Sequence, residues 1–406
     1  MGTSPALAWL DGLQGSGIRP GLGRIRALLR ALSKPHRAYR SVSVAGTNGK
    51  GSTSATINSI LLASGYRTGF YTSPHLVDIR ERWTIAGKPI EVELLDESIE
   101  KLRRAADQIG ITPTYFEALT VVAFIAFERA GCDIAVLEVG MGGRLDATNV
   151  VRPIAAVITP IGLDHMEYLG NTLRKIAAEK AGVIHRGGIV LTSNDDPVVL
   201  KILEQRATKF GNAFHVVTDE VWDTPLAGDF QRRNVALAVH TARELQPLLP
   251  RITEESISRG VATTRWRGRL ECIRIGAKKV WIDGCHNVHA AQAISPFVEK
   301  NLGRPRLLVF GIMRDKDVTG VARLLIPLFD EVITTEPYPP RCESAVSLAS
   351  IAASFGVPAR AIAEPRKALR AATESDEPVV FVAGSLYLAG EAVAFLDEWN
   401  EKQKQD

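Results

Sequence analysis

Short apolar runs rich in β-branched residues alternate along the chain with longer segments whose apolar positions recur at helical spacing. This alternation predicts parallel sheets with crossover helices, because two parallel strands can be joined only by a long connection. The fold class is therefore α/β. The predicted strands are Ser41–Ala45, Asp133–Val139, Ala155–Thr159, Ile189–Thr192, Lys279–Asp283, Arg306–Phe310, Glu331–Thr334 and Pro378–Ala383.

These strands fall into two groups that predict two domains. Between the groups lie a helical stretch at 232–245, a helix-poor piece that contains prolines, and the segment 263–269. We place the boundary in the last of these. The first domain, residues 1–266, has a mostly parallel sheet with crossover helices, and the second, residues 267–406, is a smaller Rossmann-like α/β domain.

Composition and charge narrow the class of protein. The 406 residues are 46% hydrophobic and 23% charged, which is typical of a folded globular chain. The net charge is +4 and no basic run occurs, which argues against nucleic-acid binding. The sequence has no apolar run of membrane-spanning length, no signal peptide and no C-x-x-C pair. We expect a cytoplasmic monomer that binds neither membrane nor nucleic acid.

The strongest local signal is a glycine-rich turn between a predicted strand and a predicted helix. Its glycines let backbone N–H groups approach a phosphate, while Lys50 reaches the outer phosphates and Ser52 can bind magnesium. The spacing departs from the Walker pattern, so an ordinary glycine turn is the alternative. The order of strand, turn and helix favours a P-loop-type cradle for ATP or GTP. Its residues are Gly46, Thr47, Asn48, Gly49, Lys50, Gly51 and Ser52.

Two polar residues follow consecutive predicted strands of the first domain. Glu138 ends one buried strand, and His165 comes shortly after the next. The carboxyl ends of parallel strands share one edge of the sheet, so both lie beside the phosphate loop. Each residue alone is more often a structural hydrogen-bonding group. Their shared position favours a divalent-metal site, with Mg²⁺ preferred if the other ligands are oxygens.

Further motifs follow in a fixed order along nearly the whole chain. They are Ser73-Pro-His-Leu76, Arg80-Glu-Arg82, Tyr115-Phe-Glu117, the run at 138–149, Glu179-Lys-Ala-Gly182, Gly268-Arg-Leu-Glu271, Asp283-Gly-Cys-His-Asn287, Asp315-Lys-Asp317 and Gly384-Ser-Leu-Tyr387. With the shortened phosphate loop, they resemble folylpolyglutamate synthase and the bifunctional dihydrofolate synthase/folylpolyglutamate synthase of the Mur ligase superfamily.

The resemblance implies an ATP-dependent ligase with Mg²⁺ that adds L-glutamate to a reduced folate, and to dihydropteroate to form dihydrofolate. The reaction would pass through an acyl phosphate. By this resemblance Gly49, Lys50, Gly51, Ser52, Asn234, Arg269 and Asp283 bind ATP, and Ser73, Glu138 and His165 bind magnesium. Thr114, Leu145, Asp146 and Ala147 match pterin-binding positions, and His286 and Ser385 match positions that line the incoming glutamate.

Three residues are candidates for catalysis. Lys50 would neutralise the transferring phosphoryl group. His286 would handle the amine proton or orient glutamate. Lys180 matches a position where the family often carries a carbamylated lysine, which acts as a carboxylate-like metal ligand, although an exposed helical lysine is the alternative.

Two departures and two alternative functions accompany this interpretation. Phe230 stands where the family usually has His, and Cys285 where it has Ala; we interpret Cys285 as a packing residue. A peptidoglycan-precursor ligase of the same superfamily is one alternative, and the motif that begins at Ser73 argues against it. A nucleotide-gated binding module is the other, and it leaves Asp283 and His286 without a purpose.

Overall fold

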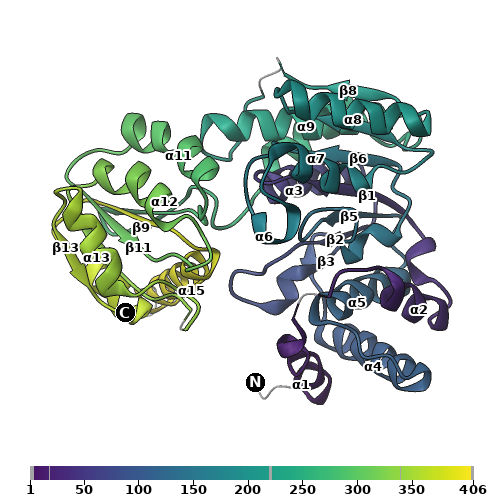
Figure 1. Cartoon of the computed structure of the whole chain (residues 1–406), viewed down its shortest axis with the longest axis horizontal. Coiled ribbons are helices and arrows are strands. Elements are labelled where there is room, and N and C mark those ends of the chain that lie inside the picture. Colours follow the sequence, from purple (N-terminus) through teal and green to yellow (C-terminus); the bar gives the residue numbers. More distant parts are fainter. Residues whose placement is uncertain (1–3, 18, 219–221, 339, 404–406) are drawn as a thin grey trace. The chain divides into compact units, whose positions relative to one another are not determined.

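The structure, a computed structural model, describes residues 4–17, 19–218, 222–338 and 340–403. It divides into two compact units, each with its own mostly parallel sheet (Figure 1). The first unit comprises Met1–Ser73, Arg80–Pro225 and Arg232–Thr264, and the second comprises Pro74–Ile79, Leu226–Gln231 and Arg265–Asp406. The predicted α/β class is confirmed.

The first unit is built on an eight-stranded sheet in the order β4-β3-β2-β5-β1-β6-β7-β8. Strand β3 pairs in antiparallel fashion with both β2 and β4, and the other printed neighbours in this sheet are parallel. The strands are β1 (Arg40–Ala45), β2 (Thr68–Tyr71), β3 (Trp83–Ile85), β4 (Lys88–Pro89), β5 (Ile134–Glu138), β6 (Ala155–Ile158), β7 (Ile189–Thr192) and β8 (Phe214–Val216). The four strands predicted here are β1, β5, β6 and β7. Because β1 lies between β5 and β6, the predicted phosphate loop leaves the middle of the sheet.

The helices of this unit surround that sheet. They are α1 (Pro5–Asp11), α2 (Gly23–Ala31), α3 (Lys50–Ala63), α4 (Val92–Ile109), α5 (Tyr115–Arg129), α6 (Met166–Leu169), α7 (Leu173–Lys180), α8 (Pro197–Phe210), α9 (Asp229–Leu245) and α10 (Glu254–Thr263). The first three residues of α9 belong to the second unit. Residues 117–127 of α5 are all buried, because α5 packs against both β2 and the amphipathic helix α4.

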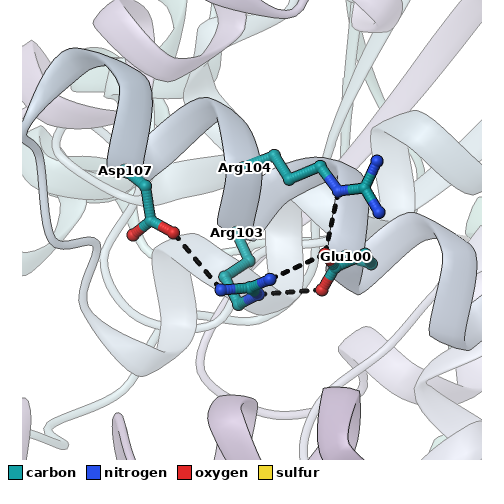
Figure 2. A network of polar contacts seen from close by, with 4 residues as sticks. All are labelled: Glu100, Arg103, Arg104 and Asp107. Carbon is teal, nitrogen blue, oxygen red and sulfur yellow. Dashed lines mark hydrogen bonds and ion pairs between the residues drawn. The ribbon is translucent and has the colours of Figure 1, made fainter.

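The outer face of α4 is polar. Figure 2 shows Glu100 accepting hydrogen bonds from Arg103 and Arg104, while Arg103 also reaches Asp107. The hydrogen bonds from Arg103 and then Arg104 lower the pKa of Glu100 to about 2. Since this cluster is exposed to solvent, it contributes little to stability and marks a solvated surface.

Helix α10 corrects one prediction. Its stretch was expected to be helix-poor, but Thr253 caps a regular helix by a reciprocal pair of hydrogen bonds with Ser256. The helix lies so close to α3 that a Cβ on Gly260 would sit 2.4 Å from the Ile60 Cα atom, and Ser59 Oγ donates to the Gly260 carbonyl at 2.7 Å. The small and polar residues that allow this approach hide the usual apolar signal of a buried helix. Helix α10 thereby holds the helix that follows the phosphate loop.

The second unit has a six-stranded sheet in the order β13-β12-β11-β14-β10-β9, parallel except for β9. Its strands are β9 (Glu271–Ile275), β10 (Lys278–Ile282), β11 (Arg306–Phe310), β12 (Glu331–Thr334), β13 (Ala359–Ala361) and β14 (Val379–Ala383). Its helices are α11 (Val288–Asn301), α12 (Val318–Leu325), α13 (Ala345–Ser354), α14 (Pro365–Thr373) and α15 (Leu386–Gln403). The predicted strands of this domain are β10, β11, β12 and β14.

The units differ from the predicted division at 266/267, since the main part of the second unit begins at Arg265. Two short segments from earlier in the chain, Pro74–Ile79 and Leu226–Gln231, pack with the second unit. The Leu76 carbonyl lies where a Cβ on Gly390 would be only 2.1 Å away, and the Leu76 side chain packs on an apolar cluster of the second unit. A single boundary in the sequence assigns every earlier segment to the first domain, so it misses segments that pack with the second unit.

Candidate active site

The phosphate-loop candidate has the predicted strand, turn and helix. Gly49 caps α3 with φ 84°, a left-handed conformation that favours glycine. A Cβ on Gly46 would lie 1.8 Å from Thr159 Oγ1, and one on Gly49 would lie 2.4 Å from Asn234 Oδ1. Both glycines are therefore required by their neighbours. The same contact places Asn234, a predicted nucleotide-binding residue, against the loop.

Two lysines meet at this loop. Lys50 Nζ donates to the carbonyls of Gly46 at 3.2 Å and Thr47 at 3.1 Å, and Lys180 Nζ donates to the Gly46 carbonyl at 2.6 Å. Lys180 is only 4% exposed, so the alternative of an exposed helical lysine is wrong. Burial, and then the charge of Lys50, lower the pKa of Lys180 to about 7. Near neutral pH a large fraction of this amine is therefore uncharged.

The three candidate metal ligands follow strands β2, β5 and β6 of the first sheet. Ser73 comes after β2, Glu138 is the buried last residue of β5, and His165 follows β6 as the N-cap of α6. Since β1 lies between β5 and β6, all three share the carboxyl edge with the phosphate loop. Within the described residues, no group of three His, Cys, Asp or Glu side chains could hold a metal. A hydroxyl, a carboxylate and an imidazole fit Mg²⁺ if phosphate oxygens complete its ligands.

The four residues matched to pterin binding surround one cavity in the first unit. Thr114, Leu145, Asp146 and Ala147 line a space of about 340 Å³, near the lower end of the roughly 300–1,000 Å³ of small-molecule sites. Apolar side chains contribute much of the remaining wall, among them those of Phe116, Met141, Tyr168 and Leu169. An apolar wall with a few convergent polar groups is typical of a small-molecule site.

Asp146 has a second task that the motif did not reveal. Its Oδ1 atom accepts hydrogen bonds from the backbone N–H of Thr148 at 3.0 Å and from the Thr148 hydroxyl at 2.6 Å, and its Oδ2 atom accepts from the N–H of Met141 at 3.0 Å. Burial raises the pKa of Asp146 while these bonds oppose the shift. The carboxyl group therefore fixes the loop at 140–146, as an Asp two residues before a Thr often does.

Glu117 lines the cavity, and the sequence analysis assigns it no role. It forms a capping box with Thr114 at the start of α5. Its Oε2 atom accepts from the Thr114 N–H at 2.8 Å and from Arg24 Nε at 3.0 Å. Its Oε1 atom is buried without a hydrogen-bond partner in the described structure. The Thr-x-x-Glu spacing at 114–117 was the available signal for the cap, but Arg24 is too distant in sequence for any motif to include it.

In the second unit, the predicted residues gather at the carboxyl ends of β10 and β14. Asp283 is buried and accepts from the N–H groups of Cys285 at 2.8 Å and Leu270 at 2.9 Å. Burial raises the pKa of Asp283, and the charge of Arg269 opposes that rise. His286 Nδ1 lies 2.8 Å from the Gly284 carbonyl, so this nitrogen carries the proton and donates it.

Two further side chains at this edge have local partners. Burial raises the pKa of Cys285 well above its usual range, so the side chain stays a thiol, which supports the packing interpretation. Ser385 is 1% exposed, and its Oγ atom accepts from the Tyr387 N–H at 3.1 Å at the start of α15. The Gly384 N–H donates to the Cys285 carbonyl at 2.9 Å, which brings the segments of Ser385 and His286 together.

Ser385→Ala should lower stability, because it removes a hydrogen bond to a helix N-terminus that contributes about 0.5–2 kcal/mol. If Ser385 also binds glutamate, the glutamate KM rises by roughly 10- to 150-fold, since a hydrogen bond to a charged ligand is lost, while the ATP KM stays unchanged. Thermal unfolding and steady-state kinetics measure the two effects. Ser344→Ala is the matched control, because Ser344 caps α13 in the same unit. An unchanged glutamate KM would make Ser385 a helix cap only.

Comparison with known proteins identifies the family. Residues 44–224 match the Mur ligase middle domain, and residues 268–386 match the Mur ligase glutamate ligase domain. A Bacillus subtilis dihydrofolate synthase/folylpolyglutamate synthase is 33% identical over 352 residues, which cover 79% of this chain and 82% of that protein. The chain belongs to the folylpolyglutamate/dihydrofolate synthase family of Mur-type ligases. The predicted family is thus confirmed.

One relative is much longer than this chain. A Halobacterium salinarum protein named "Probable bifunctional folylpolyglutamate synthase/dihydropteroate synthase" is 36% identical over 422 residues. The match covers 95% of this chain and 51% of that protein. The chain therefore spans about half the length of this relative of the family.

Solved structures of the family share the whole fold. A Mycobacterium tuberculosis folylpolyglutamate synthase complexed with ADP and AMPPCP has a TM-score of 0.87 and 31% identity, covering 96% of this chain and 98% of that chain. Escherichia coli FolC in complex with DHPP and ADP has a TM-score of 0.87 and 28% identity, covering 98% and 99%. A bifunctional family enzyme with Mn, AMPPNP and L-glutamate bound has a TM-score of 0.85 and 30% identity, covering 97% and 98%. Among the described residues of this chain, no helix is long and apolar enough to span a membrane.

Proposed function

We propose that this chain uses ATP to join L-glutamate to a reduced folate, and to dihydropteroate to form dihydrofolate. The observation that carries the proposal is the position of Lys180. Its Nζ atom bonds the phosphate loop at Gly46, and its carbonyl packs where a Cβ on Gly143 of the cavity wall would be 2.9 Å away. The phosphate loop and the cavity are therefore neighbours, as a reaction between ATP and a substrate in the cavity requires.

The chemistry needs activation of a carboxylate, because a carboxylate does not react with an amine at neutral pH. One carboxylate oxygen of the pterin substrate attacks the γ-phosphorus of ATP, the bond to the departing ADP oxygen breaks, and an acyl phosphate forms. The loop N–H groups and Lys50 stabilise the charge on the moving phosphoryl group. The amine of glutamate then attacks the acyl carbon, phosphate leaves, and the amine loses a proton. We propose that His286 accepts this proton or orients the glutamate.

Each part of the chain has a proposed ligand. In the first unit, Phe116 offers an aromatic surface for the pterin ring, and Glu117 Oε1 can accept its N–H groups, since that buried oxygen has no partner in the described structure. We propose that Arg269 and Asp283 bind the nucleotide and that Ser385 and His286 bind glutamate.

The proposed metal ligands are Ser73, Glu138 and His165. When these residues hold Mg²⁺, the ion neutralises charge on the phosphates. Carbamylation requires an uncharged amine, and the lowered pKa of Lys180 leaves much of its amine uncharged near neutral pH. We therefore propose Lys180 as the carbamylated lysine.

We also propose that the protein is a monomer in the cytoplasm. Light scattering tests the oligomeric state, and cell fractionation tests the location.

Release of ADP tests the proposed function. It is measured with dihydropteroate, with tetrahydrofolate and with a peptidoglycan precursor, each with and without glutamate, and mass spectrometry identifies the products. We expect glutamate-dependent ADP release with the two pterin substrates. Turnover with the peptidoglycan precursor but with neither pterin substrate would support the alternative of a peptidoglycan-precursor ligase. ADP release at the same rate with and without glutamate would support a nucleotide-gated binding module.

Glu138→Gln should raise the Mg²⁺ concentration needed for half-maximal rate, because the neutral amide is a poorer ligand for a hard cation than the carboxylate. The melting temperature should change little. Glu204→Gln, at an exposed position of α8, is the control. A variant that unfolds easily but keeps normal Mg²⁺ dependence would show that Glu138 is a structural hydrogen-bonding residue.

A further inference from the structure

The side chain of Arg24 contacts two segments of the wall of the cavity in the first unit. Arg24 lies on α2, and its side chain is 29% exposed, whereas the side chain of its partner Glu117 is 6% exposed. Arg24 Nε donates to Glu117 Oε2 at 3.0 Å, and another guanidinium nitrogen donates to the Arg19 carbonyl. Arg19 and Glu117 both line the cavity. The guanidinium therefore joins the loop before α2 to the start of α5, two parts of the same wall.

The two carboxylate oxygens of Glu117 differ in their hydrogen bonding. Oε2 accepts from both Arg24 and the N–H of Thr114, whereas Oε1 is buried with no partner in the described structure. A buried carboxylate is costly unless a charge and hydrogen bonds compensate it. Arg24 supplies that charge on one side. The other oxygen is left to accept N–H groups from a ligand.

We infer that Arg24 is a positioning residue for the pterin substrate, which acts by fixing Glu117 and the Arg19 loop around the cavity. The inference rests on the proposed function. Arg24 makes no contribution of its own to the backbone cap of α5, because Thr114 and Glu117 satisfy that cap reciprocally. Helix α2 is anchored independently by the buried side chains of Ile25, Leu28 and Leu29. The ion pair is thus available to organise ligand binding rather than to hold either helix in place.

The test is a double-mutant cycle on the KM for dihydropteroate, measured by glutamate-dependent ADP release with the full chain. Arg24→Met should raise this KM by about 10- to 100-fold, the scale of a lost hydrogen bond to a charged group. In a Glu117→Gln background, the same change should have a much smaller further effect, because the group through which Arg24 acts is altered. The KM values for ATP and glutamate should not change. Arg30→Met is the control, since Arg30 is exposed on the same helix.

Arg24→Lys separates position from charge. It keeps a cation but lacks the fork that reaches Glu117 and the Arg19 carbonyl together, so its KM should lie between those of the parent and Arg24→Met. This variant also replaces Arg24→Met if the latter folds poorly. An unchanged KM in either variant would overturn the inference, and so would equal effects of Arg24→Met in the two Glu117 backgrounds. If the parent chain itself shows no glutamate-dependent turnover of a pterin, the proposed function fails instead.

Discussion

Lys50→Ala is expected to lower kcat/KM by at least about 100-fold, the scale of removing a preorganised charge that stabilises a transition state. The glycine turn should remain intact, because Thr159 and Asn234 constrain Gly46 and Gly49 independently of Lys50. Steady-state kinetics with ATP, glutamate and a pterin substrate measure the loss, and the melting temperature should change little.

The matched control for this variant is Lys209→Ala, in the last turn of α8 on the surface of the same unit. It removes an equal charge far along the chain from the loop. Ordinary turnover by Lys50→Ala would mean that the glycine turn is not the phosphate site. Loss of activity in both variants would point to net charge rather than to the loop.

Lys180→Met should also lower kcat/KM by about 100-fold, on the scale of losing one electrostatic stabiliser, if a carbamate on Lys180 serves the reaction. Only the uncharged amine reacts with CO₂, and the pKa of Lys180 is about 7. The uncharged fraction therefore falls about tenfold for each pH unit below that value. Activity after CO₂ depletion should consequently recover with bicarbonate, and more slowly at pH 6 than at pH 8.

A ¹³C NMR signal from protein incubated with ¹³C-labelled bicarbonate detects the carbamate directly. Lys50→Ala provides a further check, because the charge of Lys50 contributes to the lowered pKa of Lys180. Its removal should raise that pKa and shift carbamate formation to higher pH. Activity that is indifferent to bicarbonate, with no carbamate signal, would leave Lys180 as a structural amine bonded to the Gly46 carbonyl.

Local signals explain which parts of the fold could be predicted. The predicted strands are central in their sheets, where burial on both faces produces continuous apolar runs. The strands that were missed are short or lie toward sheet edges, such as β4 and β8 in the first unit and β13 in the second. Helix α10 was missed because its contact with α3 depends on small residues such as Gly260, which carry little hydrophobic signal.

The candidate site likewise has one part that local sequence predicts and another that it does not. The phosphate loop is a continuous stretch, so its geometry follows from the order of strand, glycines and helix. Lys180, by contrast, is buried beside Gly46, which lies 134 positions away in the sequence. The pair of Arg24 and Glu117 is separated by 93 residues. Such contacts arise only when the chain is folded, so single-sequence patterns contain no trace of them.

The excursion of Leu76 limits how this chain can be dissected. A fragment that begins at residue 267 would lack Pro74–Ile79 and Leu226–Gln231, both of which pack with the second unit. It would expose the apolar surface that Leu76 covers and the backbone around Gly390. Isolated expression of the glutamate ligase half is therefore expected to yield an aggregation-prone fragment. A soluble version would need both earlier segments grafted back through designed linkers.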